Sequence, residues 1–127
     1  MPDKPTFAIF VTSSPYDSRN GESASRFCLS ALKAGYEVEQ VFFYQAGVQH
    51  ASKLLEVNSD EVDMRARWQS IAQKHQVALN VCVTAGAKRG LCEKNLAAHF
   101  RLVGISEYFA TLRHAQASGH CIKSVQF

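Results

Sequence analysis

The chain has 127 residues, of which 46% are hydrophobic and 20% are charged, and its formal net charge at pH 7 is +3. This composition is that of a globular protein and excludes a disordered one. A chain of this length can bury most of the surface that it exposes when unfolded, so one domain is expected over residues 1–127. The small net charge, with Lys and Arg scattered along the chain, argues against a nucleic-acid-binding protein, which usually carries a clustered basic face.

The sequence also argues against a membrane location. No apolar run approaches the roughly 18 residues that a membrane-spanning helix needs, and Met1 to Pro5 lack the basic and apolar regions of a signal peptide. We therefore expect a cytoplasmic protein whose cysteines are free thiols. The spacing of the cysteines contains neither a CxxC pair nor a zinc motif, so neither a metal nor a cofactor is expected. The cysteines are Cys28, Cys82, Cys92 and Cys121.

The first half of the chain has the pattern of a strand–helix–strand unit. Residues 6–12, TFAIFVT, form an almost continuous apolar run, which is typical of a parallel strand buried on both faces. After a loop, apolar residues at helical spacing predict a helix over 22–34 that ends at Gly35. A second strand is predicted over 38–44, VEQVFFY, and a short helix over 48–54 in the connection that follows.

The second half of the chain continues the alternation of strands and helices. A helix is expected from the cap residues at 58–60 to about residue 74, and another over 106–116 with Tyr108, Phe109 and Leu112 facing inward. The other expected elements are strands over 78–83, 100–104 and 121–127 and a short helical turn over 85–89. Together the elements predict an α/β fold, with a mainly parallel five-stranded sheet and helices on both faces.

Cys82 is the strongest candidate for chemistry. It lies near the end of the strand predicted over 78–83, and α/β folds open their ligand crevices at the carboxyl ends of parallel strands. Thiolates form near cations or helix N-termini, which Lys88, Arg89 and the helical turn over 85–89 would supply. The alternative is that Cys82 only packs in the strand, because free cysteine is among the most buried residue types.

The remaining candidates have weaker patterns. Cys28 lies on the apolar face of the first predicted helix, which favours packing, and Cys92 is either an incidental surface residue or a second thiol that resolves Cys82. The serine-rich loop over 13–21 precedes a helix and would suit an anion. The spacing of the histidines links none of them to a cysteine. These histidines are His50, His75, His99, His114 and His120.

Several blocks of sequence, spread from end to end, match a known family. The most specific are VFFYQAGV at 41–48 and ALNVCV at 78–83, which is followed by KRG at 88–90. The further matches are Phe7–Thr12, Ser59–Val62, Arg67–Gln69, Asn95–Ala97 and Val125–Phe127. On these blocks the chain resembles the TusD/DsrE family of small sulfur-relay proteins, and most closely its D-type subunits. The resemblance implies a DsrE-like fold.

The resemblance implies that Cys82 carries sulfur, accepting a sulfane sulfur as a persulfide and passing it on. It further implies a TusA-like donor and a TusE-like acceptor, and a relay that ends in 2-thiouridine at the wobble position of tRNA, without requiring direct contact with tRNA. Such proteins work as heterohexamers with TusB-like and TusC-like subunits. In this setting Lys88 and Arg89 would either stabilise the thiolate or persulfide, or dock an acidic patch of a partner.

Three alternatives stay open. A DsrE-type subunit would use the same chemistry in dissimilatory sulfur oxidation. A non-catalytic scaffold or small-molecule-binding subunit would share the fold without the persulfide, and a redox switch would pair Cys82 with Cys92. The chain also departs from the family pattern, because the segment over 90–95 is shorter and that over 111–121 longer. Because the shorter segment follows Cys82 closely, we expect the contacts with partner proteins to differ there from those of the family.

Overall fold

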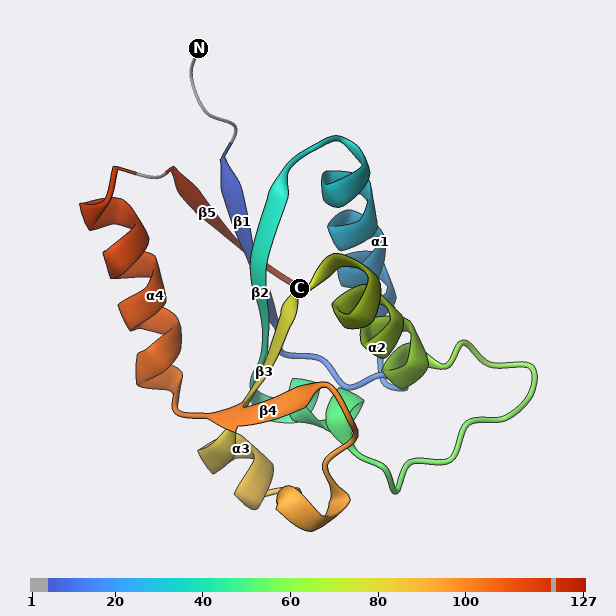
Figure 1. The fold of residues 1–127 in the computed structure, drawn as a ribbon. Coiled ribbons are helices and arrows are strands. Elements are labelled where there is room, and N and C mark those ends of the chain that lie inside the picture. Colours follow the sequence, from blue (N-terminus) through green and yellow to red (C-terminus); the bar gives the residue numbers. More distant parts are fainter. Residues whose placement is uncertain (1–4, 120) are drawn as a thin grey trace.

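The computed structural model describes residues 5–119 and 121–127, and within them five parallel strands form one sheet in the order β4-β3-β2-β1-β5 (Figure 1). The predicted α/β fold with a five-stranded parallel sheet is therefore confirmed. The strands are β1 (Thr6–Val11), β2 (Glu37–Phe43), β3 (Ala78–Cys82), β4 (Phe100–Val103) and β5 (Ile122–Gln126). The helices are α1 (Asn20–Lys33), α2 (Met64–His75), α3 (Val83–Ala87) and α4 (Ile105–Ala117), with the 3₁₀ helices η1 (Gln45–Ala51) and η2 (Glu93–Asn95).

The direction in which the chain crosses the sheet decides which face each helix covers. From β1 to β4 the strands are added in one direction, whereas the connection from β4 to β5 returns across the whole sheet. Right-handed crossovers that run in opposite directions place their helices on opposite faces. Of the helices described, α1 and α2 accordingly pack side by side on one face, and α4 lies across the other (Figure 1). Helices on both faces were expected, and the structure confirms them.

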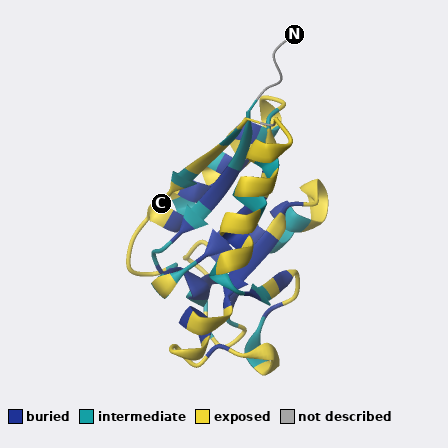
Figure 2. Ribbon diagram, turned by 90° about the vertical axis from the view of Figure 1, so that its left-hand side faces the viewer, coloured by how far each residue is buried: buried dark blue, intermediate teal, exposed yellow. Residues whose placement is uncertain are grey.

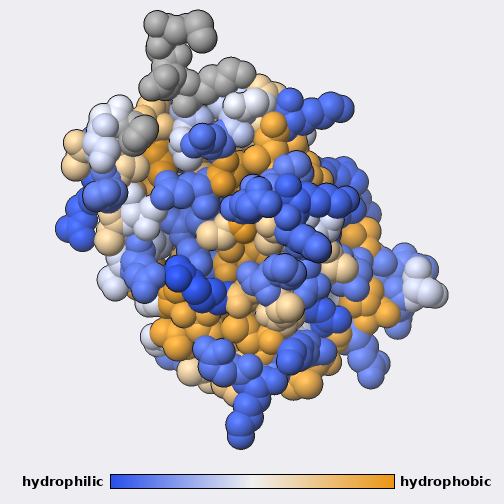
Figure 3. Space-filling view, viewed as in Figure 1, coloured by the Kyte–Doolittle hydropathy of each residue, from blue (hydrophilic) through white to orange (hydrophobic). Residues whose placement is uncertain are grey.

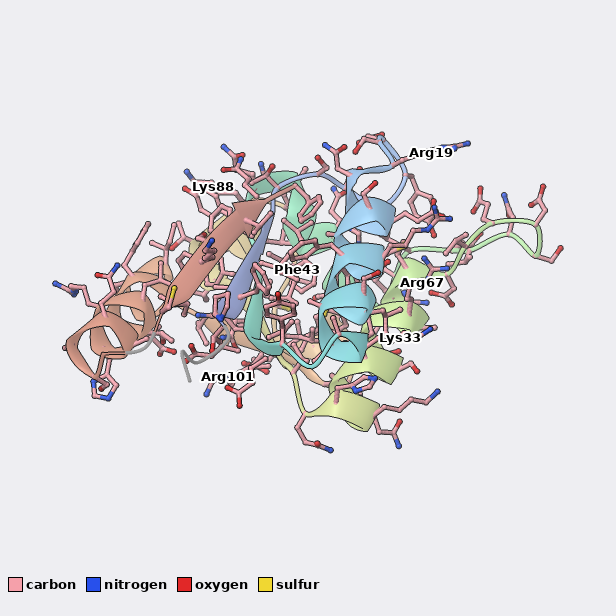
Figure 4. All side chains as sticks on the ribbon, turned by 90° about the horizontal axis from the view of Figure 1, so that it is seen from above. Arg19, Lys33, Phe43, Arg67, Lys88 and Arg101 are labelled. Atoms are coloured by element: carbon pink, nitrogen blue, oxygen red, sulfur yellow. The ribbon has the colours of Figure 1, made fainter. Side chains whose placement is uncertain are left out.

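The face beneath α1 and α2 holds the larger apolar core. Phe43 of β2 meets Trp68 of α2 edge to face, with ring centroids 5.4 Å apart, and Phe100 of β4 at 5.6 Å. In Figure 4, which views the molecule from above, Phe43 of β2 lies on the side of the sheet that faces α1 and α2. Trp68 and Ile71 of α2 are both buried against the sheet.

The opposite face is thinly covered. Within α4, all of which is described, only Tyr108 is buried, and its ring contacts Phe10 and Phe42 with centroids 5.2 Å away in each case. The prediction that Phe109 faces inward is wrong, because 52% of this residue is exposed. One helix on a wide sheet contacts it along a narrow stripe, and neighbouring helical residues point about 100° apart. Figure 2 shows α4 as mainly exposed in front of buried strands.

Several predicted boundaries are also wrong. The short helices expected over 48–54 and 85–89 are found at Gln45–Ala51 and Val83–Ala87. Helix α2 begins at Met64 rather than near the cap residues at 58–60, because Asp63 is the N-cap and its carboxylate accepts the Ala66 N–H at 3.0 Å. Asn58 instead closes a turn, in which its carbonyl accepts the Glu61 N–H at 3.0 Å. The strand predicted to continue to residue 83 ends at Cys82, and α3 begins directly after it.

Helix η1 lies very close to the carboxyl end of β1. A Cβ atom on Gly47 would be only 2.1 Å from the carbonyl oxygen of Val11, so only glycine fits at this position. The close approach brings Val48, His50 and Ala51 of η1 into the core, where η1 packs against β3 and α3. Gly47 therefore allows η1 to close over the edge of the sheet at which β3 ends.

We expect Gly47→Ala to lower the free energy of unfolding by about 3 kcal/mol, because the methyl group overlaps backbone that cannot move without displacing β1. Urea denaturation measures the change. The matched control is Gly104→Ala, whose added Cβ would meet only the Ser106 hydroxyl oxygen at an ordinary 3.6 Å; its cost as a helix N-cap is about 1 kcal/mol. Equal losses in the two variants would show that the approach of η1 to β1 is not a constraint.

Candidate functional site

Cys82 is both the last residue of β3 and the N-cap of α3. It pairs with Val103 of β4 in the sheet, and its sulfur accepts the backbone N–H of Ala85 at 3.5 Å. No loop separates the strand from the helix, so the sulfur is held by a backbone donor at the carboxyl end of the sheet. The expected position of Cys82, at a strand end beside a helical turn, is thus found, and its role as a sulfur carrier stays a prediction.

The thiol of Cys82 is enclosed, since the residue is only 2% exposed. This burial is consistent with the alternative that Cys82 only packs in the strand. It also limits the access of other sulfur atoms to the thiol. Sulfur exchange proceeds by direct attack of a thiolate on a sulfur atom, so both sulfurs must be reachable. Any exchange at Cys82 therefore needs a state in which the cover over the thiol opens.

Of the two cations predicted near Cys82, the structure brings one into its hydrogen-bond network. The guanidinium of Arg89 donates to the carbonyl of Ala85 at 3.1 Å, and so ties the end of α3 to the residue whose N–H reaches Cys82. Lys88 is exposed and extends from the periphery of the molecule (Figure 4). Arg89 thus acts on the backbone that holds the sulfur, and among the described residues neither cation forms an ion pair.

His50, near the same end of the sheet, is fixed in a neutral form. It is 1% exposed; its Nδ1 accepts the indole N–H of Trp68 at 3.3 Å, and its Nε2 donates to the carbonyl of Ser13 at 3.0 Å. Burial lowers the pKa of His50 to about 4, although the hydrogen bond to Ser13 opposes this shift. Because both ring nitrogens are occupied, His50 is a structural tie between the loop after β1 and α2, not a base.

The sequence did not single out this tie, because its partners come together only in the folded chain. The other histidines that the structure describes are exposed, and none of them forms a hydrogen bond with the sulfur of Cys82, whose partner is the Ala85 N–H. His120 lies outside the described residues. Among the described residues no group of three or more His, Cys, Asp or Glu is arranged to hold a metal ion. The exposed histidines are His75, His99 and His114.

The other cysteines lie in different settings, and all four cysteines are free thiols. Cys28 lies on the buried face of α1, and burial raises the pKa of its thiol to about 12. Cys92 is exposed at the start of η2, and Cys121 is exposed just before β5, at the amino end of the sheet. Of the four, Cys82 alone combines burial with a place at the carboxyl end of a strand.

The serine-rich loop after β1 is a poor anion site. Its Ser14 hydroxyl donates to the carboxylate of Asp17 at 2.7 Å, and its Ser13 hydroxyl accepts the side-chain amide of Asn20 at 3.2 Å. The hydroxyls are therefore used within the loop, and Asp17 adds a negative charge that repels an anion. The prediction that this loop would suit an anion is not supported.

The cavities of the described chain lie at both ends of the sheet. The largest, about 970 Å³, lies at the amino end between α4 and β2, with Tyr36, Val38 and His114 among its lining residues, and is remote from Cys82. A smaller one of about 200 Å³ lies beside α3 and includes Arg89 and Leu91. Cavity volume alone would therefore place a binding site at the amino end of the sheet. We place the candidate site at Cys82 instead, because this residue supplies a thiol at the carboxyl end of a strand.

The fold and this site define the class: a small α/β protein whose parallel sheet carries a buried cysteine at its carboxyl edge, capping a short helix. No helix in the described part of the chain is long and apolar enough to cross a membrane. The model of the DsrE/DsrF-like family matches residues 6–119, and the chain belongs to this family. The family membership predicted from the sequence blocks is thereby confirmed.

Curated relatives carry the name sulfurtransferase TusD. That of Erwinia tasmaniensis is 41% identical over 132 aligned residues, which cover 95% of this chain and 98% of the relative. That of Pectobacterium atrosepticum is 38% identical over 99 residues, or 78% of this chain and 77% of the relative. The chain is therefore similar to these sulfurtransferases over most of its length.

Two solved structures share the fold. The ychN protein of E. coli superimposes with a TM-score of 0.76 at 14% identity, over 98% of this chain and 100% of its own. A protein of unknown function, MTH1491 of Methanobacterium thermoautotrophicum, gives a TM-score of 0.63 at 13% identity, over 96% and 100% of the two chains. At such low identity these likenesses support the fold alone.

The burial of the four thiols predicts two classes of reactivity. We expect Cys92 and Cys121 to react rapidly with a disulfide reagent such as DTNB, and Cys28 and Cys82 to react slowly, since the reagent must reach the sulfur. Counting thiols against time in the native protein measures the classes, and all four react in urea. Cys92→Ser is the control, because it removes one rapid equivalent. Rapid reaction of a third thiol, lost in Cys82→Ser, would contradict the enclosed site.

The low pKa of His50 predicts a loss of stability in acid. Between pH 6.5 and 4 the unfolded chain binds a proton on this residue that the folded chain does not, so the free energy of unfolding falls as the pH falls. The shift corresponds to about 3 kcal/mol, measurable by urea unfolding at pH 7 and pH 4. His50→Gln should be less stable at pH 7 but lose most of this dependence, whereas the exposed His75→Gln should keep it. An unchanged dependence in His50→Gln would refute the assignment.

Proposed function

We propose that this protein is a sulfurtransferase of a sulfur relay, in which Cys82 accepts a sulfane sulfur as a persulfide and passes it to the next carrier. The observation that carries the proposal is the 41% identity to a sulfurtransferase TusD over 95% of the chain. The position of Cys82 supports it, because the residue lies at the carboxyl edge of the sheet with a backbone N–H directed at its sulfur.

The chemistry is a pair of thiol exchanges without net oxidation. The Cys82 thiolate attacks the terminal sulfur of a donor persulfide; a new S–S bond forms, the S–S bond of the donor breaks, and the donor cysteine leaves as a thiolate. An acceptor thiolate then attacks the terminal sulfur on Cys82, whose own sulfur leaves as a thiolate. The Ala85 N–H, which reaches this sulfur at 3.5 Å, stabilises the negative charge in both steps.

The settings of the other cysteines favour Cys82 as the carrier. Cys28 is buried with a pKa of about 12, so its thiolate is scarce at neutral pH. Cys121 lies at the amino end of the sheet, and Cys92 is on an exposed turn. In the proposed site Arg89 holds α3, and with it the Ala85 donor, in place. Lys88 has no such contact, and its exposed charge suits an encounter with an acidic partner.

The wider relay is proposed from the family resemblance. It comprises a TusA-like donor, a TusE-like acceptor, TusB-like and TusC-like subunits in a heterohexamer, a cytoplasmic location and 2-thiouridine at the tRNA wobble position as the product. The names of the relatives favour this pathway over dissimilatory sulfur oxidation, which would use the same cysteine chemistry. Neither pathway requires this chain to contact tRNA.

The proposal predicts a covalent sulfur adduct that depends on Cys82. The exposed thiols are first removed by Cys92→Ser and Cys121→Ser, since they would also react with the reagent. After incubation of this protein with inorganic polysulfide, its intact mass should rise by one sulfur atom, and reduction should reverse the gain. Adding Cys82→Ser should abolish the gain, whereas adding Cys28→Ala, at the other buried cysteine, should retain it. A gain that persists when Cys82 is replaced would disprove its role, and no gain with Cys82 present would favour a non-catalytic scaffold.

A further inference from the structure

Two segments that are far apart in the sequence enclose a pocket beside α3. Ser52 and Leu96 form an antiparallel bridge, and the Lys53 N–H donates to the Asn95 carbonyl at 2.8 Å. These contacts bring the chain after η1 alongside η2 at the foot of the molecule, where Figure 1 shows the two segments together. The cavity between them has a volume of about 200 Å³. We call it the rim pocket; its lining includes Val48, Leu54, Leu55, Arg89, Leu91 and Asn95.

The rim pocket offers apolar surface that the chain itself does not cover. Val48 and Leu91 are buried and form its inner part, whereas Leu54 is 71% exposed, more than any other large apolar residue described. In Figure 3 apolar surface shows among hydrophilic side chains over this lower part of the molecule. Removal of an apolar side chain from water is favourable in proportion to its buried area. A pocket of this size fits one such side chain from a partner.

The charge around the rim pocket is mainly positive. The segments that form it carry four exposed cations and two carboxylates, Glu56 and Glu93. Among the described residues the ion pairs are Arg26–Glu22 and Arg101–Glu107, so none of these four cations is neutralised by a neighbour. Unpaired cations around an apolar pocket complement an acidic segment. The four cations are Lys53, Lys88, Arg89 and Lys94.

The rim pocket is also connected to the proposed sulfur carrier. Arg89 lines the pocket and donates to the Ala85 carbonyl at 3.1 Å, and the Ala85 N–H reaches the Cys82 sulfur at 3.5 Å. Its guanidinium has further N–H donors that can bind a carboxylate without losing the bond to Ala85. A segment bound in the pocket therefore lies one short helix from Cys82.

We propose that the rim pocket docks an acidic segment of the protein that exchanges sulfur with Cys82. An apolar side chain of that segment inserts beside Leu54 and Leu91, and its carboxylates lie against Lys53, Arg89 and Lys94. This inference rests on the proposed function for the nature of the partner, and on the pocket and its charges for the chemistry of the segment.

The test uses an acetylated and amidated pentapeptide with a central leucine between two pairs of acidic residues. It is titrated into the ¹⁵N-labelled full-length protein and followed by NMR. We expect the shifted amides to belong to residues 48–55 and 88–96. Replacing the central leucine by serine, or the acidic residues by lysine, should abolish the shifts, and raising the salt concentration should weaken binding.

Matched variants separate charge at the rim pocket from charge in general. Lys53→Glu combined with Lys94→Glu should weaken peptide binding by about tenfold, as expected for two reversed charge contacts. The control combines Lys33→Glu with Lys74→Glu, which make the same change in net charge at the C-terminal ends of α1 and α2. Leu54→Ser tests the apolar contact and should also weaken binding.

Loading of Cys82 by inorganic polysulfide is measured on the same variants, because a small donor needs no docking segment. We expect the Lys53→Glu, Lys94→Glu protein to load like the wild type while binding the peptide about tenfold more weakly. No binding by the wild type, shifts elsewhere on the protein, or equal loss in the control pair would overturn the docking proposal. Absence of loading in the wild type would instead overturn the proposed function, so the two failures are distinguishable.

Discussion

The passage from β3 into α3 at Cys82 is the constraint on which the site depends. One residue pairs with Val103 in the sheet and also caps the helix, so that the sulfur has no flexible loop on either side. Its position is therefore set by the sheet itself, and the Ala85 N–H is held at hydrogen-bond distance by the same turn. Arg89, which follows the C-terminal end of α3, donates a hydrogen bond to the Ala85 carbonyl and so stabilises this turn. The chemistry proposed for Cys82 uses this fixed backbone donor rather than a charged side chain at the sulfur.

The two ends of the sheet are built differently. At the carboxyl end, Gly47 lies against the Val11 carbonyl and His50 joins Ser13 to Trp68, so that η1 is locked over the edge beside β3. At the amino end the largest cavity lies beside α4, a helix that covers its face of the sheet thinly. This difference follows from topology, because the single return crossover from β4 to β5 leaves one helix for a whole face. Cys82, the proposed sulfur carrier, thus lies at the end of the sheet that η1 covers.

Much of the fold follows from the sequence, because apolar runs and helical spacing identified the strands and helices in the order observed. The position of Cys82 followed from its place at the end of such a run. The start of α2 did not, since Asn58 and Asp63 are equally good caps and only the folded chain decides between them. The exposure of Phe109 and the contacts of His50 likewise depend on which elements meet, which periodicity along one segment does not encode.

The most direct test of the central claim is to locate the transferred sulfur. Wild-type protein loaded with polysulfide is trapped with an alkylating reagent, digested and sequenced by tandem mass spectrometry, so that each of the four cysteines is read separately. The account predicts that the alkylated persulfide is found on Cys82, even though Cys92 and Cys121 are more exposed. Persulfide found chiefly on the exposed cysteines, with Cys82 unmodified, would contradict it.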